Sequence, residues 1–274
     1  MAAALSAALS AIERREPVVL VTVVEVLGSA PREAGTSMLV TEHGLAGTIG
    51  GGQLEWRALE AARALLAEGG TGRTLELPLG PALQQCCGGH VALRLELLGE
   101  ADLPRLAEAL AEARAALPLV ALFGAGHVGR AVVQALGPLP CSLIWVDSRA
   151  DMFPTTMPAN AEARPTADPV AVARRLPAGA FHLVMTHSHP LDLELVATVL
   201  ERGDFAWLGL IGSETKRRRF ESQLRARGLP SERLVCPIGI AGIEGKEPPV
   251  IAASVAAQLL IAFEAVAARA GAGR

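Results

Sequence analysis

Three glycines in the middle of the chain have the spacing of a phosphate-binding turn. Gly124, Gly126 and Gly129 form the pattern Gly-x-Gly-x-x-Gly, which follows the apolar run 119–123 and opens a stretch with helical spacing. In a Rossmann fold the first glycine makes the tight turn, the second lets the backbone approach a pyrophosphate, and the third lets helix and strand pack closely. The pattern therefore predicts a Rossmann-like fold in which a helix N-terminus faces a phosphate.

An acidic residue stands where a dinucleotide-binding fold needs one. Asp147 ends the next apolar run, 18 residues after Gly129, and there a carboxylate can accept hydrogen bonds from a ribose. Arg149 follows two residues later and could instead contact a 2′-phosphate. These residues make NAD(P) a candidate ligand. The glycines could also serve packing alone or hold a different phosphate, as in a nucleotide-binding scaffold without chemistry.

Two adjacent cysteines form the second motif with possible chemistry. Cys86 and Cys87 are followed by Gly88 and Gly89. Adjacent cysteines form a disulfide only with strain, so we expect free thiols. Thiolates beside flexible glycines suit a transition metal, a sulfur centre or sulfur transfer, whereas the alternative is a small buried thiol next to a turn. The spacing does not match a zinc site, and the identity of any metal is left open.

Two polar motifs follow apolar runs in the second half of the chain. His187 and His189 follow the run 181–186, and ligand contact at the carboxyl edge of an open sheet is favoured there over a catalytic metal. Ser213 and Lys216 follow the run 207–211 at the start of a predicted helix. A hydroxyl and a cation at that place suit a phosphate or carboxylate, and the alternative is a solvated basic face.

One carboxylate precedes the last predicted helix. Glu247 lies in a long loop before the stretch that begins near Pro248. It could act as a general base, or it could simply favour the helix N-terminus by its charge.

The elements that must position these motifs fall into two patterns. The first half predicts a small α/β unit, and from residue 118 apolar strands alternate with helices, which predicts βαβ units and a parallel sheet. We therefore expect an α/β protein with an N-terminal α/β domain at 1–100, a linker helix at 101–117 and a Rossmann-like domain at 118–274. The predicted helices are 2–15, 54–67, 102–116, 127–136, one from 191, one from 214 and 248–269; the predicted strands are 17–27, 37–41, 73–77, 90–98, 119–123, 141–146, 181–186 and 207–211.

Taken together and in order, these motifs resemble the XdhC/CoxI family of xanthine dehydrogenase accessory proteins over nearly the whole chain. The resemblance rests on seven segments: 28–32, 47–55, 85–89, 124–129, 186–189, 209–213 and 245–248. CoxI-like members have a cysteine in the first glycine loop, where this chain has Gln53, and this chain has the Cys-Cys-Gly-Gly element instead. It is therefore more similar to the XdhC branch.

The resemblance implies a cofactor chaperone that is not itself an enzyme and has no catalytic residue of its own. Such proteins bind molybdenum cofactor, a pterin dithiolene (molybdopterin) carrying molybdenum and a phosphate. They support its sulfuration by a cysteine desulfurase and hand it to the large subunit of xanthine dehydrogenase. The residues expected to contact this cargo are Cys86, Cys87, Gly124, Gly126, Gly129, Asp147, His187, His189, Ser213, Lys216 and Glu247. An NAD(P)-dependent oxidoreductase is the alternative, although the chain has no Tyr and no evident hydride-transfer set.

Composition argues against two classes of partner. The net charge is −3 and aromatic residues are 3%, so the basic surplus and the stacking residues of a nucleic-acid-binding protein are missing. The most apolar stretch, 251–263, has 13 residues, fewer than the roughly 20 that span a bilayer, so we expect no membrane contact. Four cysteines and no basic leader favour free thiols in the cytoplasm. The apolar last helix predicts a homodimer.

Overall fold

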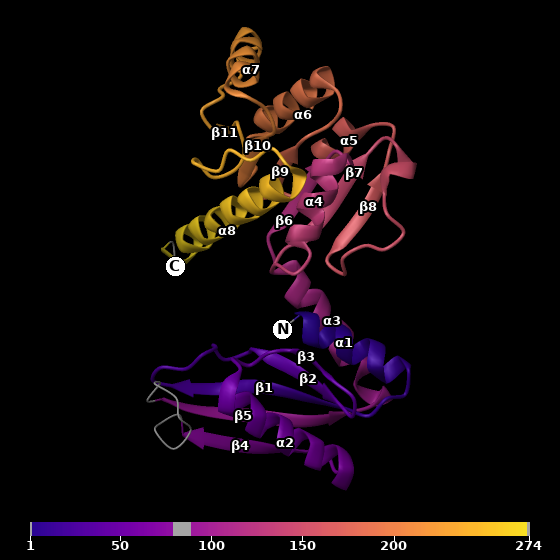
Figure 1. The fold of residues 1–274 in the computed structure, drawn as a ribbon. Helices are drawn as coiled ribbons and strands as arrows, with labels where there is room; N and C mark the ends of the chain where they lie inside the picture. Colours follow the sequence, from indigo (N-terminus) through magenta and orange to yellow (C-terminus); the bar gives the residue numbers. More distant parts are fainter. Residues whose placement is uncertain (1, 79–88, 273–274) are drawn as a thin grey trace. The chain divides into compact units, whose positions relative to one another are not determined.

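The computed structural model describes residues 2–78 and 89–272, and the chain forms two compact units (Figure 1). The units are Met1–Ala116 and Leu117–Arg274. Each unit has its own sheet and its own hydrophobic cores, so each is described by itself.

The first unit is built on an antiparallel sheet with the strand order β3-β2-β1-β5-β4. Its longest strand, β1, pairs with β2 on one side and with β5 on the other. The elements in chain order are α1 (Ala2–Glu13), β1 (Val18–Leu27), β2 (Ser37–Thr41), β3 (Leu45–Gly47), α2 (Gly52–Glu68), β4 (Gly72–Pro78), β5 (His90–Leu98) and α3 (Leu103–Ala115).

Helices cover both faces of this sheet, which explains why β1 is apolar almost throughout. Val19 and Val21 pack on the face covered by α2, whereas Val18 and Leu20 pack on the face covered by α1 and α3. Alternate side chains of a strand point to opposite faces, so a strand buried on both faces must be apolar at every position. The helix expected as a linker packs against α1 and belongs to this first unit.

The second unit is built on a parallel sheet with the order β11-β10-β9-β6-β7-β8. The chain runs from β6 outward to β8 and then returns to place β9 beside β6. This is the strand order of a Rossmann fold, and its switch point lies between β6 and β9. The elements are β6 (Leu119–Phe123), α4 (His127–Leu136), β7 (Ser142–Asp147), β8 (Ala161–Pro165), α5 (Pro169–Arg175), β9 (Phe181–Val184), α6 (His189–Arg202), β10 (Trp207–Leu210), α7 (Glu214–Ala226), β11 (Leu234–Val235) and α8 (Pro248–Ala272).

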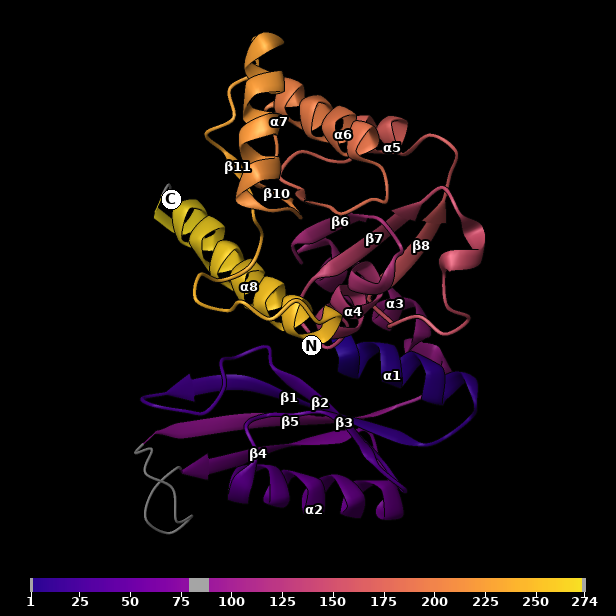
Figure 2. The same cartoon turned by 45° about the horizontal axis from the view of Figure 1, so that its top comes forward.

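Helices also cover both faces of the second sheet. In Figure 2, α4 and α8 lie on one face, and α5, α6 and α7 lie on the other. The predicted Rossmann-like parallel sheet is therefore confirmed. Among the α-helices and strands of the described residues, four were not predicted: β3, β8, α5 and β11. Each has seven residues or fewer, and the strands lie at or beside sheet edges, so none shows a sustained apolar period.

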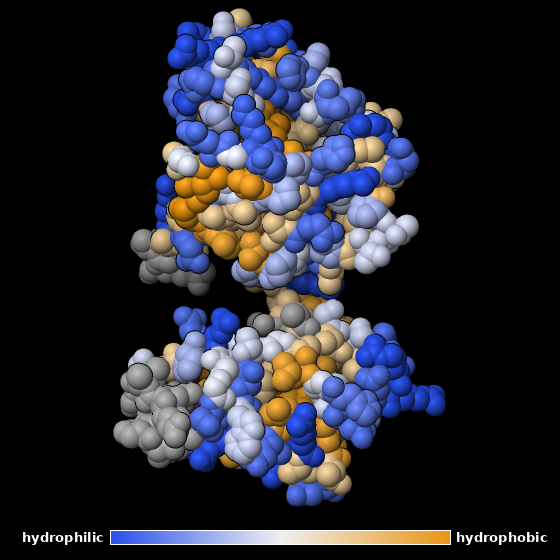
Figure 3. Space-filling view, viewed as in Figure 1, coloured by the Kyte–Doolittle hydropathy of each residue, from blue (hydrophilic) through white to orange (hydrophobic). Residues whose placement is uncertain are grey.

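The last helix, α8, is longer than the apolar stretch that predicted it. The helix segment Pro248–Arg269 has 22 residues and a mean hydropathy of 2.0, which is long and apolar enough to cross a membrane by length and composition. The length argument made from 251–263 is therefore wrong. The inner face of α8 packs into the core through Val255, Leu259 and Phe263. Its outer face leaves Ile261 65% exposed. An apolar area is visible on the surface of this unit over α8 (Figure 3).

A titratable side chain lies in the middle of the second sheet. His182, on β9, is buried and stacks with Phe123 at a centroid distance of 6.3 Å. Its Nδ1 has no hydrogen-bond partner among the described residues. Burial, assisted by the positive charge of Arg202, lowers the pKa of His182 from 6.5 to about 4. The fold therefore holds this imidazole neutral.

This shift predicts a loss of stability in mild acid. Below pH 6.5 the unfolded chain takes up a proton at His182, and the folded chain accepts it only near pH 4. The contribution of neutral His182 to the free energy of unfolding is therefore fully present above pH 6.5. It is lost as the pH falls from 6.5 to 4, by up to about 3 kcal/mol. In urea unfolding, we expect His182→Leu to show a smaller decrease in the free energy of unfolding between pH 6.5 and 4. The exposed control His43→Leu should show the same decrease as the wild type. An unchanged pH dependence in His182→Leu would contradict the assignment.

Candidate functional site

The glycine turn after β6 is held in place by three consecutive residues of β7. Gly124 N donates to the carbonyl of Val146 at 2.8 Å, and the indole Nε1 of Trp145 donates to the carbonyl of Gly124 at 3.0 Å. Asp147 Oδ2 accepts from the amide of Ala125 at 2.6 Å. Three backbone groups of the turn are therefore paired within the fold.

The three glycines of the turn have different roles. Gly124 has a φ of +122°, and a Cβ on it would strike the carbonyl of Met185. A Cβ on Gly129 would strike the carbonyl of Gly124. A Cβ on Gly126 would meet no atom within 4 Å. Gly124 and Gly129 are thus explained by packing, and only Gly126 borders open space.

That open space lies at the N-terminus of α4. Helix α4 begins at His127, and no side chain in the described part of the chain caps it at Gly126. The first amides of a helix carry a partial positive charge and need acceptors. An uncapped helix start beside open space therefore fits a phosphate or another anion.

Asp147 lies at the same turn but is already fully engaged. Its Oδ1 accepts from the amide and Nε of Arg149, each at 2.9 Å, and its Oδ2 accepts from Arg149 Nη2 at 2.9 Å as well as from Ala125. Burial opposes the ionisation of this carboxyl, but these hydrogen bonds outweigh it and lower the pKa of Asp147 to about 2. A carboxylate has about four lone-pair sites, and all are used here. Asp147 could accept from a ribose only if Arg149 released it.

A buried ion pair joins the turns that follow β9 and β10. Asp192 is fully buried, and its Oδ2 accepts from Nζ of Lys216 at 2.7 Å. Its Oδ1 accepts from the amide and hydroxyl of Thr186, at 3.0 and 2.7 Å. Lys216 Nζ also donates to the carbonyl of Ile211 at 2.9 Å. The lysine that was predicted to contact an anionic ligand is therefore neutralised within the fold.

The other predicted residues of the second unit lie in turns and at helix starts. His187 and His189 are both exposed; His187 lies in the turn between β9 and α6, and His189 is the first residue of α6. The hydroxyl of Ser213 accepts from the amide of Lys216 at 3.3 Å and caps α7. Glu247 is exposed, and its backbone carbonyl accepts the first hydrogen bonds of α8. No group of three or more potential metal-ligating side chains occurs within residues 2–78 and 89–272.

In the first unit, a second glycine loop folds around a carboxylate. Glu55, in the first turn of α2, accepts through Oε2 from the hydroxyl of Thr48 at 2.5 Å and from the amides of Ile49 and Gly51, each at 3.1 Å. A Cβ on Gly50 would lie 2.5 Å from Pro31, so this loop packs closely against the loop 28–32. Glu55 was not among the predicted site residues. Its position could have indicated a role, because it lies three residues after a glycine run, in one of the segments on which the family resemblance rests (47–55).

Cys86 and Cys87 lie outside the described residues. On either side of them, Pro78 of β4 pairs with His90 of β5. Gly89 is packed so closely that a Cβ on it would lie 2.6 Å from the carbonyl of Leu27. The described end of the segment 85–89 thus adjoins the end of β1, where the loop 28–32 begins.

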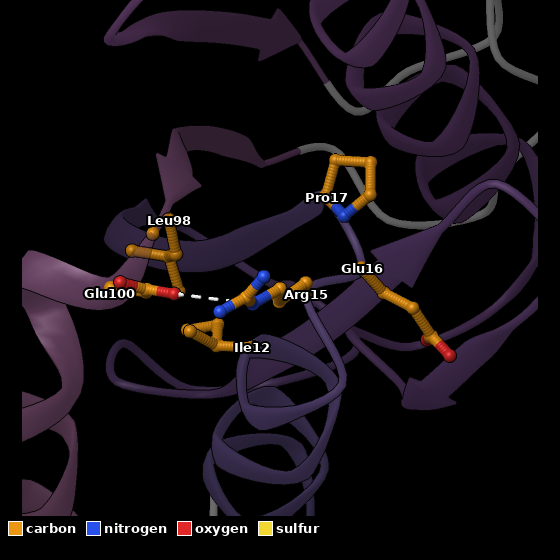
Figure 4. A pocket seen from close by; sticks show the side chains of 7 residues that line it. Ile12, Arg15, Glu16, Pro17, Leu98 and Glu100 are labelled. Carbon is orange, nitrogen blue, oxygen red and sulfur yellow. Dashed lines mark ion pairs between the residues drawn. The ribbon is translucent and has the colours of Figure 1, made fainter.

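Each unit has a hollow on the surface of its described residues. The larger, about 380 Å³, lies in the first unit and is lined in part by Arg15, Glu16 and Glu100 (Figure 4). Arg15 and Glu100 are both exposed and 3.8 Å apart. This hollow lies near the end of β5 at Leu98, whereas Gly89 precedes the start of that strand, so the hollow and Gly89 lie at opposite ends of β5. The smaller, about 160 Å³, lies in the second unit beside Gly212, one residue from Ser213.

Two family descriptions match most of the chain. Residues 120–259 match the XdhC Rossmann domain, and residues 11–77 match the XdhC and CoxI family. A relative from Escherichia coli K12, the uncharacterized protein YqeB, is 27% identical over 259 residues, which are 90% of this chain and 44% of YqeB. The chain therefore spans less than half the length of this curated relative.

A solved structure has the same fold. A protein from Bacillus halodurans, described as a xanthine dehydrogenase, superposes with a TM-score of 0.75 over 96% of both chains, at 21% identity. At this identity the likeness supports the fold alone.

The buried ion pair predicts a large difference between the two lysines of the chain. Lys216→Met leaves Asp192 buried without its countercharge, and we expect a loss of about 3–5 kcal/mol in the free energy of unfolding. Lys246→Met removes an exposed charge and should change stability by less than about 0.5 kcal/mol. Urea unfolding of both variants at pH 7 measures the difference. Equal losses in the two variants would show that the Asp192–Lys216 ion pair does not contribute to the free energy of unfolding.

Proposed function

Because the chain belongs to the XdhC and CoxI family, we propose that it is an accessory factor whose cargo is molybdenum cofactor. In this proposal the protein binds the cofactor, supports its sulfuration by a cysteine desulfurase and passes it to the large subunit of xanthine dehydrogenase. The protein itself acts as a chaperone and not as an enzyme. The family membership supports the accessory role, and the residues of the second unit support the binding of a phosphate-bearing cargo.

The observation that carries this proposal is the uncapped start of α4 beside Gly126. The cargo has a phosphate, and this helix start offers backbone amides with no competing cap among the described side chains. The bracing of the turn by Trp145, Val146 and Asp147 means that no reorganisation is needed before an anion binds.

The thiols of Cys86 and Cys87 remain part of the proposal. A thiolate can approach molybdenum or a sulfido ligand, and neighbouring glycines remove side-chain obstruction. Two other thiols, Cys141 and Cys236, are buried, and burial raises the pKa of each to about 11. These two are therefore inert, which leaves Cys86 and Cys87 as the thiols suited to sulfur chemistry.

An NAD(P)-dependent oxidoreductase is the second candidate, and the Rossmann strand order favours it. The saturated carboxylate of Asp147 argues against the binding of an adenosine ribose in the usual way. Titration of the purified protein with NADH, NADPH and molybdenum cofactor separates the candidates. Tight nucleotide binding without cofactor binding would replace the chaperone proposal.

Substitutions at Gly126 test the phosphate site directly. Aspartate is a preferred helix cap, so Gly126→Asp should occupy the free amides with its own carboxylate and repel an anion. We expect at least tenfold weaker binding of both inorganic phosphate and molybdenum cofactor, with no loss of thermal stability. Gly126→Ala is the matched control, because a methyl group there meets no atom within 4 Å and adds neither cap nor charge. Wild-type affinity in Gly126→Asp would remove the central support of the proposal.

We also propose that the protein acts in the cytoplasm as a homodimer. The exposed apolar residues Leu260, Ile261 and Val266 of α8 are the surface suited to a second copy. Light scattering at micromolar concentration should give a dimer mass for the wild type, and Ile261→Glu should shift it towards the monomer. A monomer mass for the wild type would contradict this proposal.

A further inference from the structure

The smaller hollow in the second unit has the construction of a ligand cavity. It has a volume of about 160 Å³ and lies where the turn after β10, the loop before α8 and the first turns of α8 meet. Four isoleucines form most of its wall, and two glycines, a lysine and a serine complete it. The lining residues are Ile211, Gly212, Ile238, Ile243, Gly245, Lys246, Ile251 and Ser254.

The floor of the cavity is fixed by the buried ion pair. The carbonyl of Ile211 accepts from Nζ of Lys216, which is paired with Asp192. The aliphatic part of Lys216 presses against Gly212, where a Cβ would lie 2.7 Å from Lys216 Cδ. The glycine at this position therefore keeps the floor flat and open.

One wall is fixed by two polar residues of α8. The side-chain amide of Gln258 makes two hydrogen bonds to the backbone of Gly239, at 2.8 and 2.9 Å. The hydroxyl oxygen of Ser254 accepts from the amide of Ile240 at 2.7 Å. The loop is thus held to the helix on its inner side, whereas Ile243 on its outer side remains 49% exposed at the cavity.

Two polar groups of the lining are left for a ligand. Ser254 is 5% exposed, and its hydroxyl proton has no acceptor among the described residues. Lys246 is exposed and forms no ion pair within residues 2–78 and 89–272. An apolar wall with one buried donor and a cation nearby suits a heterocyclic ring that bears a hydrogen-bond acceptor and belongs to an anionic molecule.

The cavity and the glycine turn lie at the same edge of one sheet. Gly126 follows β6 and Gly212 follows β10, and β9 separates these two strands. Neighbouring strands are about 4.8 Å apart, so the two positions are separated by about 10 Å across the sheet. A single ligand with a phosphate at one end and a ring at the other can span this separation.

We propose that this cavity binds the terminal heterocyclic ring of the ligand whose phosphate binds at Gly126. A cavity of about 150 Å³ holds a benzene ring, so a cavity of 160 Å³ admits one six-membered ring, and the rest of a fused ring system projects from its mouth. Ser254 donates to an acceptor on the ring, and Lys246 compensates the negative charge of the ligand. This inference rests on the proposed function and adds where the ring of the cargo binds.

Calorimetric titration with three probes tests the proposal: inorganic phosphate, a pterin without phosphate, and a pterin with a phosphomonoester side chain. Ile243→Trp reduces the space at the cavity, and Lys246→Met removes its cation. We expect each variant to bind the phosphorylated pterin at least tenfold more weakly and inorganic phosphate as the wild type does. Leu45→Trp, at an exposed position of β3 that does not line the cavity, should bind all three probes as the wild type does.

The outcomes separate this inference from the proposed phosphate site. Equal affinity of the wild type and Ile243→Trp for the phosphorylated pterin overturns the cavity assignment, even if Gly126→Asp loses phosphate binding. Binding of the unphosphorylated pterin that Ile243→Trp abolishes, with no phosphate binding by any variant, supports the cavity and overturns the phosphate site. Absence of pterin binding to the wild type overturns the inference as well.

Discussion

A charge buried away from water needs a countercharge beside it, and in this protein the carboxylate of Asp192 is completely buried and finds Lys216. This pair connects two turns that are far apart in the sequence and adjacent in the sheet. Thr186, after β9, donates to one oxygen of the carboxylate, and Lys216, in α7, donates to the other. The edge on which both proposed binding positions lie depends on this contact, because Lys216 also holds the carbonyl of Ile211.

The glycine turn after β6 is stabilised in a similar way by its neighbouring strand. A second buried carboxylate, that of Asp147, binds the amide of Ala125, and the indole of Trp145 binds the adjacent carbonyl. The amide and carbonyl of Gly124 and the amide of Ala125 thus have partners within the fold, whereas no side chain of the described residues caps the start of α4. A braced turn with an uncapped helix start suits an anion, and the carboxylate of Asp147 at this turn is already neutralised by Arg149.

In the first unit, too, a carboxylate holds a glycine loop in place, here beside an antiparallel sheet. Glu55 binds two backbone amides and a hydroxyl of the glycine loop that precedes α2. Close packing of this loop against the loop 28–32 explains why glycine stands at position 50. Gly89 shows that the end of the Cys-Cys-Gly-Gly segment adjoins β1. Three of the segments on which the family resemblance rests therefore meet at one end of this sheet: 28–32, 47–55 and the described end of 85–89.

Much of the fold was predictable because apolar periodicity is a local signal. The apolar runs at β1, β6 and β9 and the helical spacing of α2 and α4 predicted elements within a few residues of their bounds. The short elements β3, β8, α5 and β11 gave no such signal, since edge strands and a helix of seven residues bury too little apolar surface to show a period. The bounds of α8 were predicted within three residues, as 248–269 against Pro248–Ala272, but the length of its apolar segment was underestimated because polar residues interrupt it without ending the helix.

By itself the sequence determined the Rossmann-like order of strands and helices, the glycine turn and the resemblance to one family, since these depend on residue types at fixed spacing. Only the tertiary structure decided which polar groups are free. Asp147 and Lys216 were predicted to contact a ligand, but in the structure they form ion pairs with Arg149 and Asp192. The helix start at Gly126, in contrast, has no side-chain cap among the described residues. Hydrogen-bond partners are chosen by contacts between residues distant in sequence, so no local pattern could have distinguished the occupied groups from the free ones.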